Sequence, residues 1–166
     1  DQMDDFKQHV FVWSQQFETI AWLDSNEYDQ QYTAFDCALA VEEFTSIKTD
    51  YKEAFDKLKE YQSVTKDYIF GYISYDVKND VEQLSSDNLD QLGFSDLYFF
   101  QPQKLIFIKG NNVEFQYLKM VENEIENDFQ EIQKSQITKT KKTSSEIKIK
   151  LRIHKDQYNA KIAKVI

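Results

Sequence analysis

The residues best suited to hold a small ligand lie at the end of a predicted strand. The segment Trp22-Leu23-Asp24-Ser25 places a carboxylate beside a hydroxyl, and aromatic residues follow at Tyr28, Tyr32 and Phe35. Aromatic walls exclude water, so that a few oriented polar groups can fix a small polar–aromatic ligand. A structural role is the alternative, because Asp and Ser side chains also hydrogen-bond their own backbone in local turns. Spacing alone leaves both interpretations open.

A glycine marks a second candidate position. Gly71 interrupts residues 68–76, a run of aromatic and β-branched residues that predicts a strand. Glycine within a strand indicates a bulge, or a close approach by a ligand or by another backbone. A second aromatic stretch, residues 93–100, follows after a polar loop. The sequence does not decide between ligand and backbone as the neighbour of Gly71.

The single cysteine raises the question of nucleophilic catalysis. A cysteine nucleophile needs a nearby base and a lowered thiol pKa. Cys37 lies on the apolar side of a predicted strand, and neither His9 nor His154 belongs to a recognisable motif. We therefore predict a buried structural thiol. The sequence also lacks a phosphate-binding loop, a dinucleotide fingerprint, paired Cys/His zinc spacing and a serine-hydrolase elbow.

Two acidic stretches have the composition of a metal site but not its pattern. Residues 122–128 place Glu122 with Glu126, and Glu124 with Asp128, in i, i+4 rows that predict the solvated face of a helix. Residues 87–93 faintly resemble a calcium loop, but Leu89 stands at the third ligand position. We predict no metal site in this chain.

The net charge of −9 is unevenly distributed. Residues 134–166 hold 10 basic and 2 acidic residues, a net of +8, which leaves 10 basic against 27 acidic residues in 1–133, a net of −17. The acidic part is not expected to bind nucleic acid, because phosphate affinity requires clustered cations. We predict that the basic part is solvated, with phosphate binding as the alternative.

Cysteine usage and hydropathy bound the compartment. One cysteine excludes an internal disulfide and favours a reducing, cytoplasmic location. No apolar run approaches the ~20 residues of a membrane span, and no signal peptide is visible. The chain begins without Met and ends within an apolar helical pattern, so we expect residues 1–166 to be one domain and a fragment of a larger protein.

The remaining patterns position these candidates on strands and helices. Strands are predicted at residues 9–13, 19–23, 35–41, 68–76, 98–101, 105–108, 113–120 and 147–153. The strand at 35–41 should be half-buried, with Phe35, Cys37, Leu39 and Val41 on one face. Helices are predicted at residues 50–62, capped by Asp50, at 122–136 and at 156–166.

The order of these elements predicts an α+β fold. Pro102 separates two strands, the turn 109–112 joins the second of them to 113–120 as a hairpin, and hairpins make antiparallel sheets. Residues 77–96 are predicted to form a polar loop or a short irregular segment, and residues 137–145 a polar linker within the domain. Helices segregated from the strands then pack outside the sheets.

Four segments in this order resemble the N-terminal region of the chorismate-utilising enzymes, the family of anthranilate synthase component I and aminodeoxychorismate (para-aminobenzoate) synthase component I. The segments are Trp22-Leu23-Asp24-Ser25, Phe70-Gly71-Tyr72-Ile73-Ser74-Tyr75-Asp76, Gly93-Phe94-Ser95-Asp96-Leu97 and Ile153-His154-Lys155-Asp156-Gln157-Tyr158. The resemblance covers nearly the whole chain and is closer to the para-aminobenzoate branch, because anthranilate synthases tend to have Leu-Leu-Glu-Ser at the first segment.

The resemblance implies an amino-acid pocket and a place in a larger fold. In the family the first of these segments, the aromatic loop that follows it and the Gly-containing strand line a pocket that holds tryptophan, as a feedback inhibitor or as a structural ligand. Carried over by position, the pocket residues are Leu23, Asp24, Ser25, Tyr32, Phe35, Gly71 and Tyr72. Ala34 stands where the family often has Arg, which removes a cation that could fix a ligand carboxylate. The implied fold is part of a larger α/β/β/α sandwich.

The resemblance also implies what the chain does not do. The family's catalytic glutamates and magnesium ligands lie in a C-terminal half, so these 166 residues should be inactive alone. The intact enzyme would use Mg²⁺ and ammonia from a glutamine amidotransferase subunit to aminate chorismate to 4-amino-4-deoxychorismate for folate synthesis. The alternatives are the anthranilate branch, which serves tryptophan synthesis, and a stand-alone regulatory module that binds an aromatic amino acid.

Overall fold

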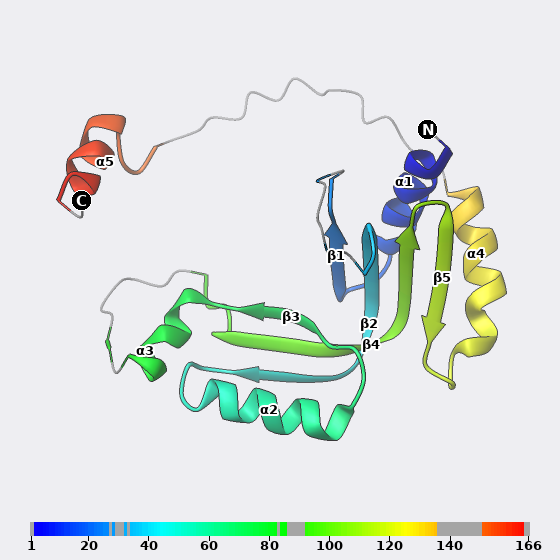
Figure 1. The fold of residues 1–166 in the computed structure, drawn as a ribbon, viewed down its shortest axis with the longest axis horizontal. Helices are drawn as coiled ribbons and strands as arrows, with labels where there is room; N and C mark the ends of the chain where they lie inside the picture. The colour runs from blue at the N-terminus through cyan, green and yellow to red at the C-terminus, as the bar shows by residue number, and fades with distance from the viewer. Residues whose placement is uncertain are drawn as a thin grey trace.

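A computed structural model describes residues 2–26, 28, 32, 34–82, 84–85, 92–135 and 151–164. Its elements, in chain order, are α1 (Gln2–Ser14), β1 (Ile20–Asp24), β2 (Cys37–Thr49), α2 (Ala54–Thr65), β3 (Phe70–Ile73), η1 (Tyr75–Val77), α3 (Lys78–Val81), β4 (Leu97–Lys109), β5 (Asn112–Tyr117), η2 (Glu122–Glu124), α4 (Ile125–Lys134) and α5 (Lys155–Ile162). This arrangement confirms the α+β class with an antiparallel sheet and helices outside it (Figure 1).

The five strands form a single bent sheet in the order β1-β2-β4-β3, with β5 also paired to β4. The long strand β4 carries both partners on one edge: residues 104–109 pair with β5, and residues 97–100 pair with β3. The sheet therefore has an upper limb, made with β1 and β5, and a lower limb, made with β3 (Figure 1). All pairings are antiparallel.

The bend follows from irregularities that face each other in β2 and β4. The register between the two strands shifts between Glu43 and Thr45, and Glu42 has a left-handed φ of 61°. Pro102 pairs with Glu43, where it has no N–H to donate to the ladder. A bulge of this kind bends and twists a strand. The sequence predicts two short strands around Pro102, but β4 is continuous because the bulge accommodates the proline.

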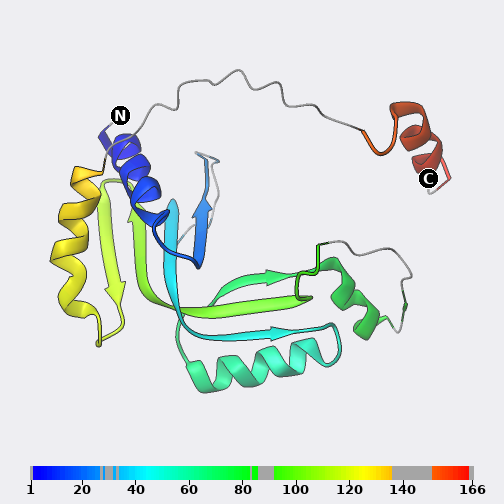
Figure 2. The same ribbon diagram turned by 180° about the vertical axis from the view of Figure 1, so that it is seen from behind.

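In the part of the sheet domain that the structure describes, helices cover only the outer side of the bend (Figures 1 and 2). On the upper limb, Val10 and Trp13 of α1 and Ile132 of α4 pack with Leu39 and other strand residues in one buried cluster. On the lower limb, Ala54 of α2 packs with Leu97 and Val77 in another. Each limb thus buries one face under its own helices.

Among the described residues, the inner side of the bend is built from strand residues and from Phe35, Tyr68 and Phe94, which lie outside the strands. Its buried core is Ala38, Ala40, Phe70, Phe100 and Leu105. An aromatic surface, which we call the inner face, extends from this core, with ring contacts that join Phe35 and Tyr68 to Phe107, and Phe70 through Phe100, Tyr98 and Tyr72 to Phe94. Tyr68, Tyr72 and Phe94 are 52%, 40% and 70% exposed. No helix residue belongs to this cluster within the described part of the chain.

The strand predicted at residues 9–13 is wrong, because these residues lie in α1. Their local composition is β-branched and aromatic, but Phe6, Val10 and Trp13 recur at helical spacing and pack on one side against the sheet. The half-buried strand predicted at 35–41 is also wrong in part. Strand β2 begins at Cys37, and Ala38 and Ala40 are fully buried on its second face.

Smaller differences concern the ends of elements. Helix α2 begins at Ala54 rather than residue 50, and Asp50 accepts a hydrogen bond from the Lys52 amide instead of capping it. The strand predicted at 68–76 is limited to Phe70–Ile73, because Ser74 caps a turn of 3-10 helix. The predicted linker 137–145 and residues 147–150 of the last predicted strand lie outside the described residues, and 151–153 do not form a strand.

Candidate functional site

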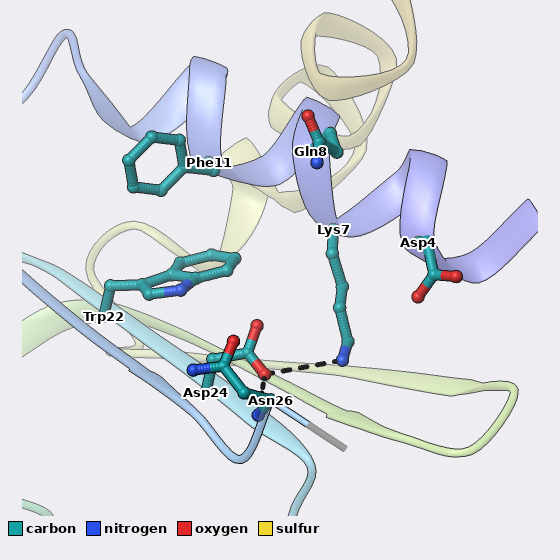
Figure 3. A pocket seen from close by; sticks show the side chains of 7 residues that line it. All are labelled: Asp4, Lys7, Gln8, Phe11, Trp22, Asp24 and Asn26. Atoms are coloured by element: carbon teal, nitrogen blue, oxygen red, sulfur yellow. Dashed lines mark hydrogen bonds and ion pairs between the residues drawn. The ribbon is translucent and has the colours of Figure 1, made fainter. Parts of the chain in front are cut away.

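A cavity of about 490 Å³ lies between α1 and β1 (Figure 3). It is lined from the helix by Asp4, Lys7, Gln8 and Phe11, and from the strand and its end by Trp22, Asp24 and Asn26. The periodicity of the helix and of the strand explains why these residues line the cavity together. Lys7 and Phe11 are one turn apart on α1, and Trp22 and Asp24 are alternate residues of β1, so each pair points the same way.

The polar end of this cavity holds an ion pair. The Lys7 Nζ lies 3.6 Å from Asp24 Oδ1, and the two side chains are only 18% and 20% exposed. Asp24 Oδ1 also accepts a hydrogen bond of 2.9 Å from the Asn26 amide. Asp24 therefore makes the local turn that the sequence offered as a structural alternative, and it lines a cavity as well.

The apolar end of the cavity is aromatic. The rings of Phe11 and Trp22 meet edge to face, with their centroids 5.4 Å apart (Figure 3). A cation, a carboxylate and an aromatic wall in one cavity match the parts of an aromatic amino acid: carboxylate, ammonium and ring. The sequence identified Asp24, but Lys7 and Phe11 could be found only once α1 was known to be a helix on this strand.

The structure does not bring the seven predicted pocket residues into one cavity. Asp24 faces α1, whereas Leu23 alternates to the other face of the sheet and is 47% exposed. Phe35 lines a second cavity of about 330 Å³ on the inner face, beside Tyr68 and Phe107.

The other four predicted residues, Ser25, Tyr32, Gly71 and Tyr72, line neither of these two cavities. The Ser25 amide donates to the Asp36 carbonyl oxygen at 2.9 Å, and the Tyr32 side chain is 86% exposed. Gly71 and Tyr72 belong to β3 on the lower limb. The predicted amino-acid pocket remains a prediction, with the α1–β1 cavity as a more compact alternative for the same ligand chemistry.

The neighbour of Gly71 is another backbone. A Cβ added at this position would overlap the carbonyl oxygen of Tyr98 and come within 2.6 Å of the Phe99 Cα, both on the paired strand β4. Glycine is therefore required for β3 to approach β4. This contact decides between the two interpretations of Gly71 that the sequence left open.

Sequence reasoning missed a buried lysine, Lys104, and the groups around it. We call Lys104 and these partners the Lys104 cage. Lys104 is 5% exposed, and its Nζ lies 2.8 Å from Asp128 Oδ2, 2.7 Å from Glu124 Oε2 and 3.5 Å from Glu42 Oε2. The Tyr117 hydroxyl donates to Asp128 at 3.0 Å. Asp128 is 5% exposed, so its predicted place on a solvated face is wrong.

The Lys104 cage keeps the lysine charged. Burial alone would lower the pKa of Lys104, but hydrogen bonds to Asp128 and Glu124 outweigh it and raise that pKa. Burial also raises the pKa of Tyr117, with the Asp128 charge adding to the shift. The cage ties η2 and α4 to the sheet beside the bend. The acidic partners Glu124, Asp128 and Glu42 lie 20, 24 and 62 residues from Lys104 in the sequence, which explains why spacing did not reveal the cage.

A second polar group lies on the lower limb. Tyr98 donates a 2.6 Å hydrogen bond to Glu43 Oε2, and Ser46 donates one of 2.6 Å to Glu43 Oε1. The bonds from Ser46 and Tyr98 lower the pKa of Glu43. Burial, followed by the bond to Glu43, raises the pKa of Tyr98 to about 12.

Cys37 is 1% exposed, and burial followed by the Asp24 charge raises its pKa to about 12. This confirms a buried thiol without the activation that a nucleophile needs.

Within the described ranges, no group of three or more His, Cys, Asp or Glu side chains is arranged to hold a metal ion. In those same ranges, none of the helices is long and apolar enough to cross a membrane.

Comparison with known proteins finds a match to a protein family. The sequence pattern of a family described as chorismate binding enzyme matches residues 18–166, which is all of the chain beyond α1 and the turn that follows it. A search of curated proteins finds no match.

Proposed function

The chain belongs to the family of chorismate binding enzymes, and from that premise we propose that it is the N-terminal, non-catalytic part of an aminodeoxychorismate (para-aminobenzoate) synthase component I. The intact enzyme would aminate chorismate to 4-amino-4-deoxychorismate for folate synthesis. The branch is proposed from the Trp22-Leu23-Asp24-Ser25 segment, where anthranilate synthases tend to have Glu before Ser.

The observation that carries this proposal is the one-sided covering of the sheet. Helices bury the outer face of both limbs, whereas the inner face presents Tyr68, Tyr72 and Phe94 to solvent at 52%, 40% and 70% exposure. An apolar surface of contacting rings that no helix covers is typical of an interface. A second layer packed on the inner face would complete a sandwich.

We assign that second layer to the chorismate-binding half of the same protein. In this division of work, residues 1–166 bind and orient the other half through the inner face, and the Lys104 cage keeps α4 and the sheet rigid behind it. The catalytic glutamates and the Mg²⁺ ligands would belong to the other half. A glutamine amidotransferase subunit would supply ammonia.

The product of the intact enzyme tests the assigned branch. Incubation of an enzyme that carries this chain with chorismate, an ammonium salt and Mg²⁺ should yield 4-amino-4-deoxychorismate, identified by mass spectrometry after chromatography. Formation of anthranilate and pyruvate instead would move the protein to the anthranilate branch.

Substitution on the inner face tests the assigned interface. The pair Tyr72→Ser and Phe94→Ser should leave the unfolding free energy of the isolated chain within about 1 kcal/mol, because Phe94 is largely exposed and Tyr72 is partly exposed. The same pair should greatly reduce the activity of the intact enzyme. A matched pair on the outer surface, Val64→Ser with Tyr75→Phe, at 77% and 81% exposure, should leave that activity unchanged. Equal effects of the two pairs would contradict the interface.

A second candidate function is regulatory binding of an aromatic amino acid, and the α1–β1 cavity favours it. Lys7 would bind the ligand carboxylate, Asp24 the ammonium group, and Phe11 with Trp22 the ring. The chain has two tryptophans, so a Trp13→Phe variant makes Trp22 fluorescence a local reporter. Phenylalanine should quench it more strongly than phenethylamine or 3-phenylpropionate, each of which lacks one charge.

Two variants separate this site from unspecific binding. Asp24→Asn keeps an acceptor for the Asn26 amide, and Lys7→Gln keeps most of the side chain. Each should weaken phenylalanine binding on the order of tenfold, or about 1.4 kcal/mol. Equal binding of the three phenyl ligands, or no change in either variant, would eliminate the amino-acid site.

A further inference from the structure

Strand β3 lies at an edge of the lower limb (Figure 1). Among the residues that the structure describes, it pairs with β4 alone. Gly71, Tyr72 and Ile73 are all exposed, and Ile73 remains 44% exposed although it belongs to a strand. Within the described part of the chain, the side of β3 that faces away from β4 is therefore open to another segment.

The hydrogen-bond pattern shows which backbone groups lie on this open side. In an antiparallel pair, alternate residues exchange hydrogen bonds, and the residues between them direct their N–H and C=O groups outward. The Ser74 amide donates to the Asp96 carbonyl oxygen at 2.7 Å, in the same register as the strand pair. Tyr72, two residues earlier, therefore also bonds to β4. Gly71 and Ile73 direct their backbone groups away from β4.

The carbonyl oxygen of Tyr98 supports this pattern independently. A Cβ added at Gly71 would overlap that oxygen, so the Tyr98 carbonyl points at β3. Tyr98 stands opposite Tyr72, which is the pair expected to exchange hydrogen bonds. The Gln101 amide, at the alternate position of β4, points instead to the β2 side, where the Tyr61 hydroxyl binds it. Strand β3 thus presents backbone donors and acceptors at its open edge.

Strand β3 also lacks the features that discourage further pairing. Edge strands are usually protected by charged side chains, prolines or bulges. The other open edges of the described sheet carry such features, with Asp24 in β1, Glu114 in β5, and Lys48 beyond the bulge in β2. Strand β3 is Phe70-Gly71-Tyr72-Ile73, without charge or proline. Among the described edges, it is therefore the best suited to accept another strand.

The inner face continues to this edge through Tyr72. The Tyr72 ring contacts the rings of Tyr98 and Phe94, at centroid distances of 6.0 and 6.5 Å. A layer that packs on these rings ends beside the open edge of β3. A second copy of the chain is a poorer occupant, because residues 1–133 hold 10 basic against 27 acidic residues, and two such bodies repel each other.

We propose that β3 accepts an additional strand from the chorismate-binding half of the same protein, held by main-chain hydrogen bonds to Gly71 and Ile73. Strand addition draws its affinity from the backbone, so the partner must be extended but needs no particular side chain for these bonds. The sheet of the lower limb then continues from this chain into the other half. The inference rests on the proposed second layer and adds a backbone contact at its margin.

Amide hydrogen exchange, read by mass spectrometry at single-residue resolution, tests this pairing. In residues 1–166 alone, the Tyr72 amide should be protected by its bond to β4, and the Gly71 and Ile73 amides should exchange rapidly. In the intact enzyme, exchange at Gly71 and Ile73 should slow by about a hundredfold or more. The Trp22 amide is the matched control, because the same alternation places it at the open edge of β1, and its rate should not change.

Two variants at position 73 isolate the edge hydrogen bonds. Ile73→Pro removes an outward N–H and leaves the bonds of β3 to β4, a position at which sheets tolerate proline. In the intact enzyme, this variant should return the Gly71 amide to its rate in the chain alone. Ile73→Val keeps the N–H and should leave Gly71 slow. Protection of the Tyr72 amide in the Ile73→Pro chain alone verifies that β3 still forms.

Rapid exchange of Gly71 and Ile73 in the intact enzyme would overturn the added strand. Hydroxyl-radical labelling of the Tyr72 and Phe94 rings then separates the two proposals. Rings shielded in the enzyme would retain the inner-face interface without the strand, and rings labelled as in the chain alone would remove both. Slow exchange of Gly71 and Ile73 already in the chain alone would also overturn it, because this chain or a second copy would then occupy the edge.

Discussion

At the residue scale, the Tyr61 hydroxyl bonds two backbone groups beside the register shift in the sheet. It donates to the Thr45 carbonyl oxygen at 2.9 Å and accepts from the Gln101 amide at 3.1 Å. Tyr61→Phe leaves both groups without this partner. We expect the unfolding free energy to fall by about 1–3 kcal/mol, measured by urea denaturation. Tyr75→Phe, at an 81% exposed position, is the control and should change it by less than about 0.5 kcal/mol.

Tyr98 makes stability depend on alkaline pH. Burial and the bond to Glu43 raise its pKa from about 10 to about 12, so the folded state holds a proton that the unfolded state releases. The resulting stability is complete below pH 10 and is lost as the pH rises toward 12. Urea denaturation between pH 8 and pH 11 should show the decline. Tyr98→Phe should show a shallower decline, with a remainder from Tyr117; an unchanged slope would contradict this role.

Residue-level prediction from sequence succeeded where a side chain acts locally and failed where it acts across the fold. The turn at Asp24 depends only on a hydrogen bond from the Asn26 amide, two residues further on, so the sequence was enough to suggest it. The Lys104 cage instead gathers acids from β2, η2 and α4. Asp128 and Glu124 are four apart on a surface-like pattern, and the cation on β4 explains why both contact Lys104 and why Asp128 is buried.

At the scale of elements, β3 is held by the close approach that Gly71 permits. Gly71→Ala would place a methyl group against the backbone of β4, which cannot move aside as a side chain can. We expect a loss of about 3 kcal/mol and fast amide exchange in residues 70–73. Gly110→Ala, in an open turn at φ 53°, should cost only about 1–2 kcal/mol and leave β3 protected. Normal protection of β3 in Gly71→Ala would refute this explanation.

The Lys104 cage connects helix α4 to the sheet. Lys104→Met keeps the apolar stem but leaves Asp128 buried without its cation, so we expect a loss of about 3–5 kcal/mol in urea denaturation. Adding Asp128→Asn should recover part of it. Lys48→Met, whose side chain is 58% exposed, should change stability by less than about 1 kcal/mol. A loss in Lys104→Met no larger than that in Lys48→Met would show that the cage is not stabilising.

Elements with a clear period were predicted well, and those shaped by tertiary contacts were not. The β4–β5 hairpin, β1 and α4 follow their patterns, and the hairpin turn at Gly110 is typical. Helix α1 was misread because a five-residue window shows β-branched composition but not the seven-residue spacing of Phe6, Val10 and Trp13. The continuity of β4 through Pro102 depends on the bulge in β2, which no local pattern announces.

At the scale of the whole molecule, the fold is a bent sheet with helices on one side and an aromatic surface on the other. The antiparallel α+β class was predictable from the order of hairpins and helices. The sharp bend was not, and it is the bend that gives the inner face two limbs and a common buried core of Ala38, Phe70 and Phe100. A surface of this form suits a chain that supports a catalytic partner layer.

Chorismate turnover by residues 1–166 alone tests this division of work most directly. The purified chain is incubated with chorismate, an ammonium salt and Mg²⁺, and chorismate is followed by chromatography beside an enzyme-free control. We predict that chorismate disappears at the same rate in both samples, because the catalytic residues belong to the half that would pack on the inner face. Faster chorismate loss with the chain, accompanied by an aminated product, would contradict the account.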